Sequence, residues 1–241
     1  RQIGLRSGGR RHGFESPASC RRKSKVHHKK QGQEMILKKA VITNFRGING
    51  SITVNFDLFN CIVGQNDAGK STILKALDAS LNETTLSRAD YNVQAQDNQI
   101  IVELFFDCKN KQYLLGEEIL TTIESEELTN EENLLVWKKV WNVTETNVSK
   151  PKTSIVRKKY NGTSDFISKT EAQLIAQCTA NTIATAKGNG EAYNNVEKRE
   201  KLREFNQQNN IAFTYEVEEI PGTGTSKLKA IGDAIKKVLP S

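Results

Sequence analysis

The spacing of apolar residues predicts an ordered series of strands that begins at Met35. Residues 35–45 form an apolar run typical of a strand, and residues 52–56 alternate apolar and polar side chains as a half-buried strand does. The apolar residues of 59–63 are followed by Gly64, which predicts a short buried strand that ends at this glycine. Three strands are therefore expected before any helix.

The rest of the chain mixes helical and strand patterns. A helix is predicted next, because four apolar residues recur on one helical face: Ile73, Leu74, Leu77 and Leu81. Apolar runs predict further strands at 99–106, 134–143, 153–160 and 213–220. Helical spacing predicts helices at 169–178, at 191–206 and at the end of the chain, where one face carries Leu228, Ile231, Ile235, Val238 and Leu239. This mixture indicates an α/β protein.

Residues 1–34 differ from the rest of the chain in composition. They show no periodicity and are rich in Arg, Lys, Gly and Ser, so we expect a disordered basic leader. Ten of their side chains are Lys or Arg and two are Glu, so the net charge of +7 lies in this leader and residues 35–241 are close to neutral. The leader is interpreted as a non-native extension before a start at Met35, the only methionine, or as an arm that contacts nucleic acid.

Several classes of site are unfavourable on composition. The four cysteines are Cys20, Cys61, Cys108 and Cys178, and they form no CxxC pair. Neither a disulfide framework nor a zinc site is therefore expected, and a cytoplasmic location fits. All histidines lie in residues 1–34, which excludes histidine chemistry from 35–241. No run approaches the roughly 18 apolar residues of a membrane helix, so no membrane partner is expected.

One motif predicts chemistry directly. Residues 64–72 match G-x-x-x-x-G-K-[ST] between a predicted strand and a predicted helix: Gly64, Gln65, Asn66, Asp67, Ala68, Gly69, Lys70, Ser71 and Thr72. Such a loop holds phosphates with its N–H groups, while Lys70 contacts the β- and γ-phosphates and Ser71 binds Mg²⁺. The alternative, a glycine-rich turn that caps a helix, leaves Lys70 where the helix dipole disfavours a cation.

Other candidate sites are weaker. Asp107 ends an apolar strand as a Walker B aspartate does, but Cys108 follows instead of Glu, and a simple sheet-end residue is favoured. The carboxylates of Glu216, Glu218 and Glu219 are expected to be solvated, because one strand cannot present adjacent residues on one face. Two further expectations concern structure alone: Trp137 and Trp141 pack in the core or on the sheet, and Thr225 or Ser226 caps the last helix.

Two segments together resemble a known family. The segments Met35-Ile-Leu-Lys-Lys-Ala-Val-Ile-Thr-Asn-Phe-Arg-Gly and Cys61-Ile-Val-Gly-Gln-Asn-Asp-Ala-Gly-Lys-Ser-Thr resemble the ABC-type ATPase head shared by the RecF, SMC and OLD families. The variant Asn66-Asp67-Ala68 looks most like the OLD family of ATP-dependent endonucleases, some of which act in bacterial defence. The resemblance implies a P-loop NTPase fold with a mixed β-sheet and flanking helices, ATP with Mg²⁺, and Arg46 as a further phosphate or ribose contact.

The same resemblance sets the functional expectations. Residues 35–241 are expected to be the N-terminal part of an ABC-type ATPase domain, since no LSGGQ-like segment, Walker B Asp-Glu pair or Toprim pattern is found. Such a head forms a homodimer around ATP, acts on DNA in the full-length protein, and hydrolyses ATP inefficiently as a fragment. The alternatives are an SMC- or RecF-like DNA-binding ATPase without nuclease, a compact kinase or GTPase that uses Asp107, and a regulatory or inactive product.

Overall fold

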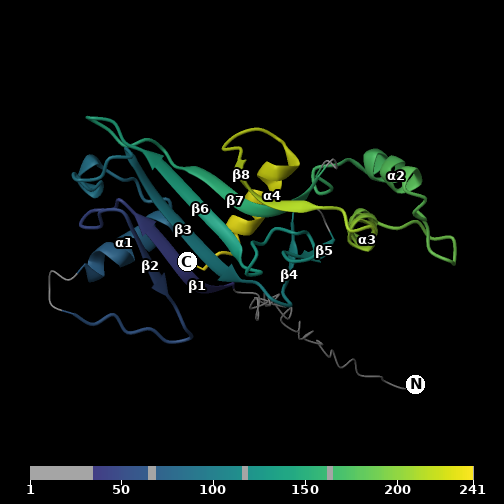
Figure 1. Cartoon of the computed structure of the whole chain (residues 1–241), viewed down its shortest axis with the longest axis horizontal. Coiled ribbons are helices and arrows are strands. Elements are labelled where there is room, and N and C mark those ends of the chain that lie inside the picture. The colour runs from purple at the N-terminus through teal and green to yellow at the C-terminus, as the bar shows by residue number, and fades with distance from the viewer. Residues whose placement is uncertain (1–34, 65–68, 116–118, 162–164, 241) are drawn as a thin grey trace, which may run out of the picture. The chain divides into compact units, whose positions relative to one another are not determined.

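A six-stranded antiparallel sheet is the framework of the computed structural model (Figure 1). The residues described are 35–64, 69–115, 119–161 and 165–240, all within the compact unit Gly32–Ser241. Every neighbouring pair of strands is antiparallel, and the order across the sheet is β2 (Ser51–Asn55), β1 (Ile36–Thr43), β3 (Gln99–Asp107), β6 (Leu135–Asn142), β7 (Lys152–Tyr160) and β8 (Phe213–Ile220). The expectations for residues 1–34 and for Gln65–Ala68 lie outside the described residues.

Strand alternation places the core on one face of this sheet. In β3 every second residue is fully buried, namely Ile100, Val102, Leu104 and Phe106. They pack with Ala76 and Ala79 of α1 (Lys70–Leu81) and with Ile231 and Ile235 of α4 (Lys227–Lys236), so these two helices cover the core face. Trp137 and Trp141 of β6 belong to the same cluster, which confirms their expected role in the core.

The remaining elements are short or lie beside the sheet. A separate hairpin joins β4 (Gln112–Leu114) to β5 (Leu120–Thr122), and a 3₁₀ turn, η1 (Arg88–Asp90), follows α1. The helices α2 (Glu171–Ala180) and α3 (Asn195–Gln208) pack on each other around a second, smaller cluster that contains Tyr160, Phe166, Leu174, Cys178 and Leu202. None of the helices in the described ranges has the length and apolar character required to cross a bilayer.

The helix starts follow the expected capping chemistry. Thr170 and Asn194 form reciprocal capping boxes at the starts of α2 and α3. Ser226 is the N-cap of α4 and accepts a hydrogen bond from the Lys229 N–H at 3.2 Å, which selects Ser226 over Thr225. These caps satisfy N–H groups that the first helical turn leaves without partners.

The predicted strand at 59–63 is wrong. Residues 58–64 are not in a strand and make no backbone–backbone hydrogen bond with other described residues, while Phe59 and Val63 are 86% and 82% exposed. A strand forms only where a neighbouring strand supplies hydrogen bonds, and no described strand lies beside this segment. The expectation of a mixed sheet is also corrected, because all neighbouring strands of the described sheet are antiparallel.

Candidate nucleotide-binding site

The phosphate-loop motif leads directly into helix α1. Gly64 and Gly69 bracket Gln65–Ala68, which lie outside the described residues. Gly69 is the N-cap of α1 and has a φ of 80°, in the left-handed region that favours glycine. A Cβ on Gly69 would meet no atom within 4 Å, so backbone conformation, and not lack of space, requires glycine here.

The N-terminus of α1 has the character of an anion site. The Gly69 carbonyl accepts hydrogen bonds from the N–H groups of Thr72 at 3.0 Å and Ile73 at 3.2 Å, which starts the helix. The first turn carries no acidic residue, and no side chain caps it. N–H groups at a helix start carry partial positive charge, so a phosphate can act as the cap that the side chains do not supply.

Lys70 contacts the first glycine of the motif. Its Nζ donates a hydrogen bond of 2.5 Å to the carbonyl oxygen of Gly64, which places the ammonium at the mouth of the motif. Ser71, the next residue, is exposed, so its hydroxyl is accessible to a hydrated cation. The ammonium of a lysine at a helix start is repelled by the positive end of the helix dipole. An anionic ligand between the ammonium and the helix N-terminus would attract both and offset this repulsion.

Arg46 lies in the turn between β1 and β2 and is paired with Asp90. Its Nε and Nη2 both donate to Oδ1 of Asp90, at 2.8 and 2.7 Å, and its backbone N–H donates to the Asp90 carbonyl at 2.8 Å. The guanidinium borders a hollow of about 680 Å³. Sequence reasoning named Arg46 and missed Asp90, although the spacing Ser87-x-x-Asp90 resembles a capping box and could have indicated it.

Asp107 has the local environment of a sheet-end residue. It is the last residue of β3, and its Oδ1 accepts a hydrogen bond from the Lys109 N–H at 2.9 Å. Asp107 pairs with Ile36 at the start of β1, whereas the Arg46 turn follows the other end of that strand, at Thr43. Seven residues of extended strand separate these ends by roughly 24 Å. Asp107 and Arg46 therefore lie at opposite ends of β1.

The acidic residues of β8 are exposed or half-buried, as expected for solvated carboxylates, and each is also in an ion pair. Glu216 pairs with Lys159 at 2.8 Å, Glu219 pairs with Lys152 at 3.1 Å, and Glu218 pairs with Arg157, in each case from β7. The cross-strand pairing of a basic strand with an acidic strand explains this arrangement. Across the described ranges, no cluster of three or more His, Cys, Asp or Glu side chains is suited to a metal ion.

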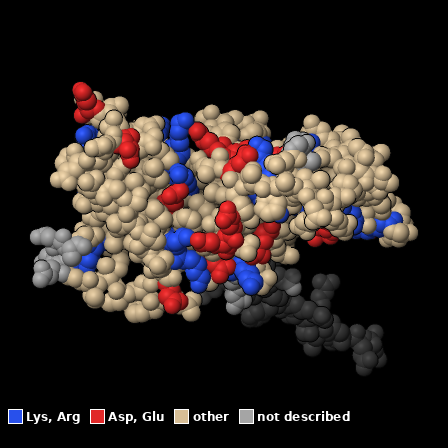
Figure 2. Space-filling model, in the orientation of Figure 1, with Lys and Arg blue, Asp and Glu red and all other residues tan. Residues whose placement is uncertain are grey.

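Surface charge shows no dominant sign on the visible face. In Figure 2, Lys and Arg side chains are interspersed with Asp and Glu over the middle of the molecule. Among the described ion pairs, Lys138 pairs with Glu103 at 3.0 Å and Lys39 pairs with Glu132 at 2.8 Å.

Three described residues fit a phosphate loop: Gly69 is left-handed at the head of α1, Lys70 donates to the Gly64 carbonyl, and Ser71 is exposed. This arrangement is compatible with the class of P-loop NTPases. The chain matches the AAA ATPase domain family over residues 35–241, and it belongs to that family. Comparison with curated proteins gave no match. Membership supports ATP binding and ATPase function in general, and the fold described above is compatible with a P-loop NTPase.

Proposed function

We propose that this chain is the ATP-binding head of an OLD-type, ATP-dependent DNA endonuclease whose nuclease domain is not among its residues. The observation that supports the proposal is the pair of sequence segments Asn44-Phe45-Arg46-Gly47 and Gly64–Thr72, of which the second leads into α1 through the left-handed Gly69. The sequence Asn66-Asp67-Ala68 within the loop favours the OLD type over SMC- or RecF-like ATPases. The neutral composition of residues 35–241 supports a DNA contact that lies elsewhere in the full-length protein.

The described residues have separate tasks in nucleotide binding. N–H groups at the start of α1 bind phosphate oxygens, and the left-handed Gly69 lets the backbone approach them. Lys70 exchanges the Gly64 carbonyl for the β- and γ-phosphate oxygens, so its charge moves from a neutral to an anionic acceptor. The Ser71 hydroxyl holds Mg²⁺, which when bound neutralises part of the phosphate charge.

Assembly of two heads is part of the proposal. Next to Gly64, the side chains of Leu58, Phe59 and Val63 are 86%, 86% and 82% exposed. Several strongly exposed apolar side chains in one short segment support a surface that another polypeptide covers. In the proposed homodimer, ATP bound at one head is enclosed by the second head, and hydrolysis is inefficient until that enclosure forms.

The proposal is tested by sedimentation velocity and phosphate release on the same samples. ATP with Mg²⁺ is expected to convert monomer to dimer in the wild type but not in Lys70→Ala, with slow phosphate release. A chain that stays monomeric at saturating ATP would contradict the head-dimer proposal. Rapid turnover by the monomer, lost in Asp107→Ala, would favour the compact kinase or GTPase instead. ATP-dependent cleavage of plasmid DNA by the full-length protein tests the nuclease assignment.

A further inference from the structure

Strand β8 forms one edge of the six-stranded sheet, and β7 is its neighbour on one side only. Five of its eight residues are exposed, and its register with β7 runs without a bulge from Phe213 to Ile220. Edge strands are commonly protected by short length, proline, lysine or a bulge. The opposite edge, β2, has five residues, whereas β8 is longer and contains neither proline nor lysine. Strand β8 is therefore a regular edge without these protections.

The direction of the backbone groups of β8 follows from its pairing with β7. The Asn161 N–H donates to the Ala212 carbonyl at 2.8 Å, which makes these residues a hydrogen-bonded pair in the register that continues from Tyr160 and Phe213. Such pairs alternate with non-hydrogen-bonded pairs along an antiparallel ladder. Every second residue of β8 therefore directs its N–H and C=O away from β7: Phe213, Tyr215, Val217 and Glu219. Within the ranges that the structure describes, these outward groups have no backbone partner.

The side chains beside this free edge differ between the two faces of the sheet. Phe213 and Val217 lie on one face, where they are 44% and 59% exposed, and Glu219 ends the same row. Glu216 and Glu218 lie on the other face, with side chains that are 47% and 32% exposed. A strand added to this edge would therefore place alternate side chains beside apolar residues and the others beside carboxylates.

Strand β7 shows which residues pair well with this composition. Lys152, Arg157 and Lys159 of β7 each form an ion pair with one of the three glutamates of β8. A second copy of β8 is the opposite case. In the two antiparallel registers that overlap most, the outward groups pair and Glu216 lies opposite Glu216 or Glu218 of the other copy. Like charges directly opposite each other destabilise a sheet, so the favoured occupant carries basic residues.

We propose that the free edge of β8 binds an extended polypeptide segment in which basic and apolar residues alternate. The segment adds a further strand to the sheet, with its basic side chains beside Glu216 and Glu218 and its apolar side chains beside Phe213 and Val217. Main-chain hydrogen bonds supply affinity in such strand addition, and alternate side chains supply specificity. The carboxylates that contact β7 keep acceptor sites for a second cation, because two oxygens offer about four lone pairs.

The first test is site-resolved amide hydrogen exchange of the full chain with the synthetic peptide Thr-Lys-Val-Lys-Val-Lys-Val-Thr, capped at both ends. The peptide is expected to slow exchange at the outward amides of Phe213, Tyr215, Val217 and Glu219. The amides of Thr214, Glu216 and Glu218 face β7, so their exchange should change little. Protection that does not alternate along β8, or no protection at all, overturns the proposal.

The second test measures affinity by fluorescence anisotropy of the labelled peptide. Val217→Pro removes an outward N–H but no hydrogen bond to β7, and it should weaken binding at least about fivefold. Thr53→Pro is the matched control on the other edge. Its N–H also points outward, because the Phe56 N–H donates to the Lys38 carbonyl in the same register. Thr53→Pro should bind as the wild type does.

A peptide with glutamate in place of each lysine should bind at least about tenfold more weakly. If Val217→Pro does not fold, a peptide with N-methylated valines takes its place, since these amides cannot donate to the edge. Equal affinity of the lysine and glutamate peptides, or of the wild type and Val217→Pro, overturns the proposal. Self-association of the chain without peptide in sedimentation velocity, abolished by Val217→Pro, assigns the edge to a second copy and also overturns it.

Discussion

At the scale of single residues, Gly69 is constrained by its backbone conformation and Lys139 by the burial of its charge. Gly69 sits in open space, yet its φ of 80° restricts it to glycine. Lys139 is the opposite case, since it is only 1% exposed in β6, and its ammonium lies 3.8 Å from the Glu83 carboxylate. Lys236 binds the same carboxylate at 2.6 Å, so Glu83 is shared between two cations. Each constraint gives a measurable consequence.

Replacement of Gly69 by alanine tests the conformational constraint. We expect Gly69→Ala to lower the free energy of unfolding by about 1 kcal/mol and to weaken ATP binding, because alanine disfavours the left-handed region. Gly188→Ala is the control, since Gly188 has neither a positive φ nor a neighbour within 4 Å of its Cβ position. Urea unfolding and ATP titration of both variants provide the test. Equal effects of the two substitutions would contradict the conformational argument.

The buried Lys139 predicts a rise in stability at alkaline pH. Burial lowers the pKa of Lys139 to about 8, and Glu83 offsets only part of this. Between pH 8 and about 10 the unfolded chain keeps the Lys139 proton that the folded protein has lost, so stability increases with pH. From pH 8 to 9.5 this contribution is about 1 to 2 kcal/mol, and Lys139→Met should abolish it. The measurement is urea unfolding across this pH range. The assignment is refuted if the free energy of unfolding changes with pH equally in the wild type and in Lys139→Met.

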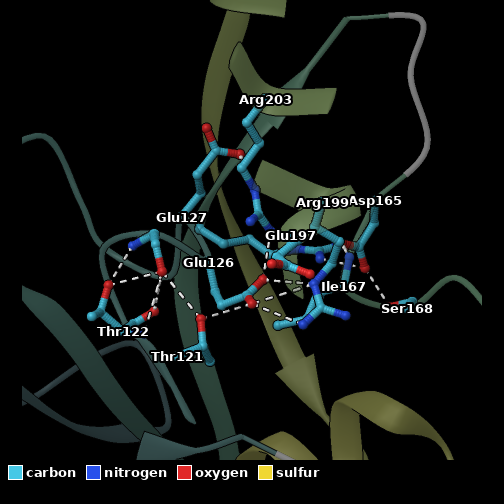
Figure 3. Close-up of polar contacts among 12 residues, drawn as sticks. Thr121, Thr122, Glu126, Glu127, Asp165, Ile167, Ser168, Glu197, Arg199 and Arg203 are labelled. Atoms are coloured by element: carbon cyan, nitrogen blue, oxygen red, sulfur yellow. Dashed lines mark hydrogen bonds and ion pairs between the residues drawn. The ribbon is translucent and has the colours of Figure 1, made fainter. Parts of the chain in front are cut away.

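At the scale of elements, the contact between α3 and the loop after β5 depends on a buried carboxylate. Figure 3 shows Glu126 facing Arg199 and Arg203, with hydrogen bonds of 2.8 and 3.0 Å from Arg199 and 2.6 Å from Arg203. Thr121 donates a further bond of 3.0 Å, and the Glu126 side chain has no exposed surface. Burial would raise the pKa of Glu126, but the two arginines outweigh it and lower the pKa. The carboxylate therefore stays ionised.

Removal of this carboxylate should detach α3. Glu126→Ala leaves two buried guanidinium groups without their anion, and we expect a loss of about 3 kcal/mol or more in the free energy of unfolding. Because the pKa is lowered, the contribution is present above about pH 4.3 and is lost as pH falls further. Asp233→Asn, which breaks an exposed pair with Lys229, should cost less than about 0.5 kcal/mol. Hydrogen exchange in α3 that did not increase in Glu126→Ala would contradict this account.

The packing of α4 on β8 predicts a helix glycine that resists replacement. A Cβ on Gly232 would lie 2.5 Å from Cγ2 and 3.0 Å from Cδ1 of Ile220. Gly232→Ala should therefore destabilise the protein by about 1 to 2 kcal/mol, although alanine is the better helix former. The double variant with Ile220→Ala should be about 1 kcal/mol more stable than the sum of the single effects. If the two effects are additive in thermal unfolding, the cost of Gly232→Ala does not come from a clash with the Ile220 side chain.

At the scale of the whole molecule, local periodicity predicted most elements, and pairing decided where prediction failed. The strand at 99–106 was predicted closely, because its nearly continuous apolar run lies between two neighbouring strands, β1 and β6. The segment 59–63 has equally apolar residues, but no described strand lies beside it. Apolar character indicates a tendency to be covered, whereas strand formation depends on a partner that the local sequence does not contain. The short hairpin of β4 and β5 has too few residues for a periodic signal.

The same distinction between local sequence and long-range contacts explains which residues of the candidate site were predicted. The motif identified Gly69, Lys70 and Ser71 because the roles of a phosphate loop are contiguous in sequence. Asp90 escaped, since its contact with Arg46 joins residues 44 positions apart and depends on how two turns meet at the end of the sheet. The buried charge network around Glu126 was missed for the same reason. Arg199 lies 73 positions away, on a helix whose many charged residues give no sign that one of them is buried.

The most direct test of ATP binding compares two lysines of the same helix. Lys70 and Lys75 both lie in α1, but only Lys70 belongs to the phosphate loop. By calorimetry with Mg²⁺, Lys70→Ala should lose ATP binding at least about a hundredfold, whereas Lys75→Ala should bind as the wild type does. GTP should bind more weakly than ATP to the wild type. Equal ATP affinity of all three proteins would contradict the assignment of this loop as the nucleotide site.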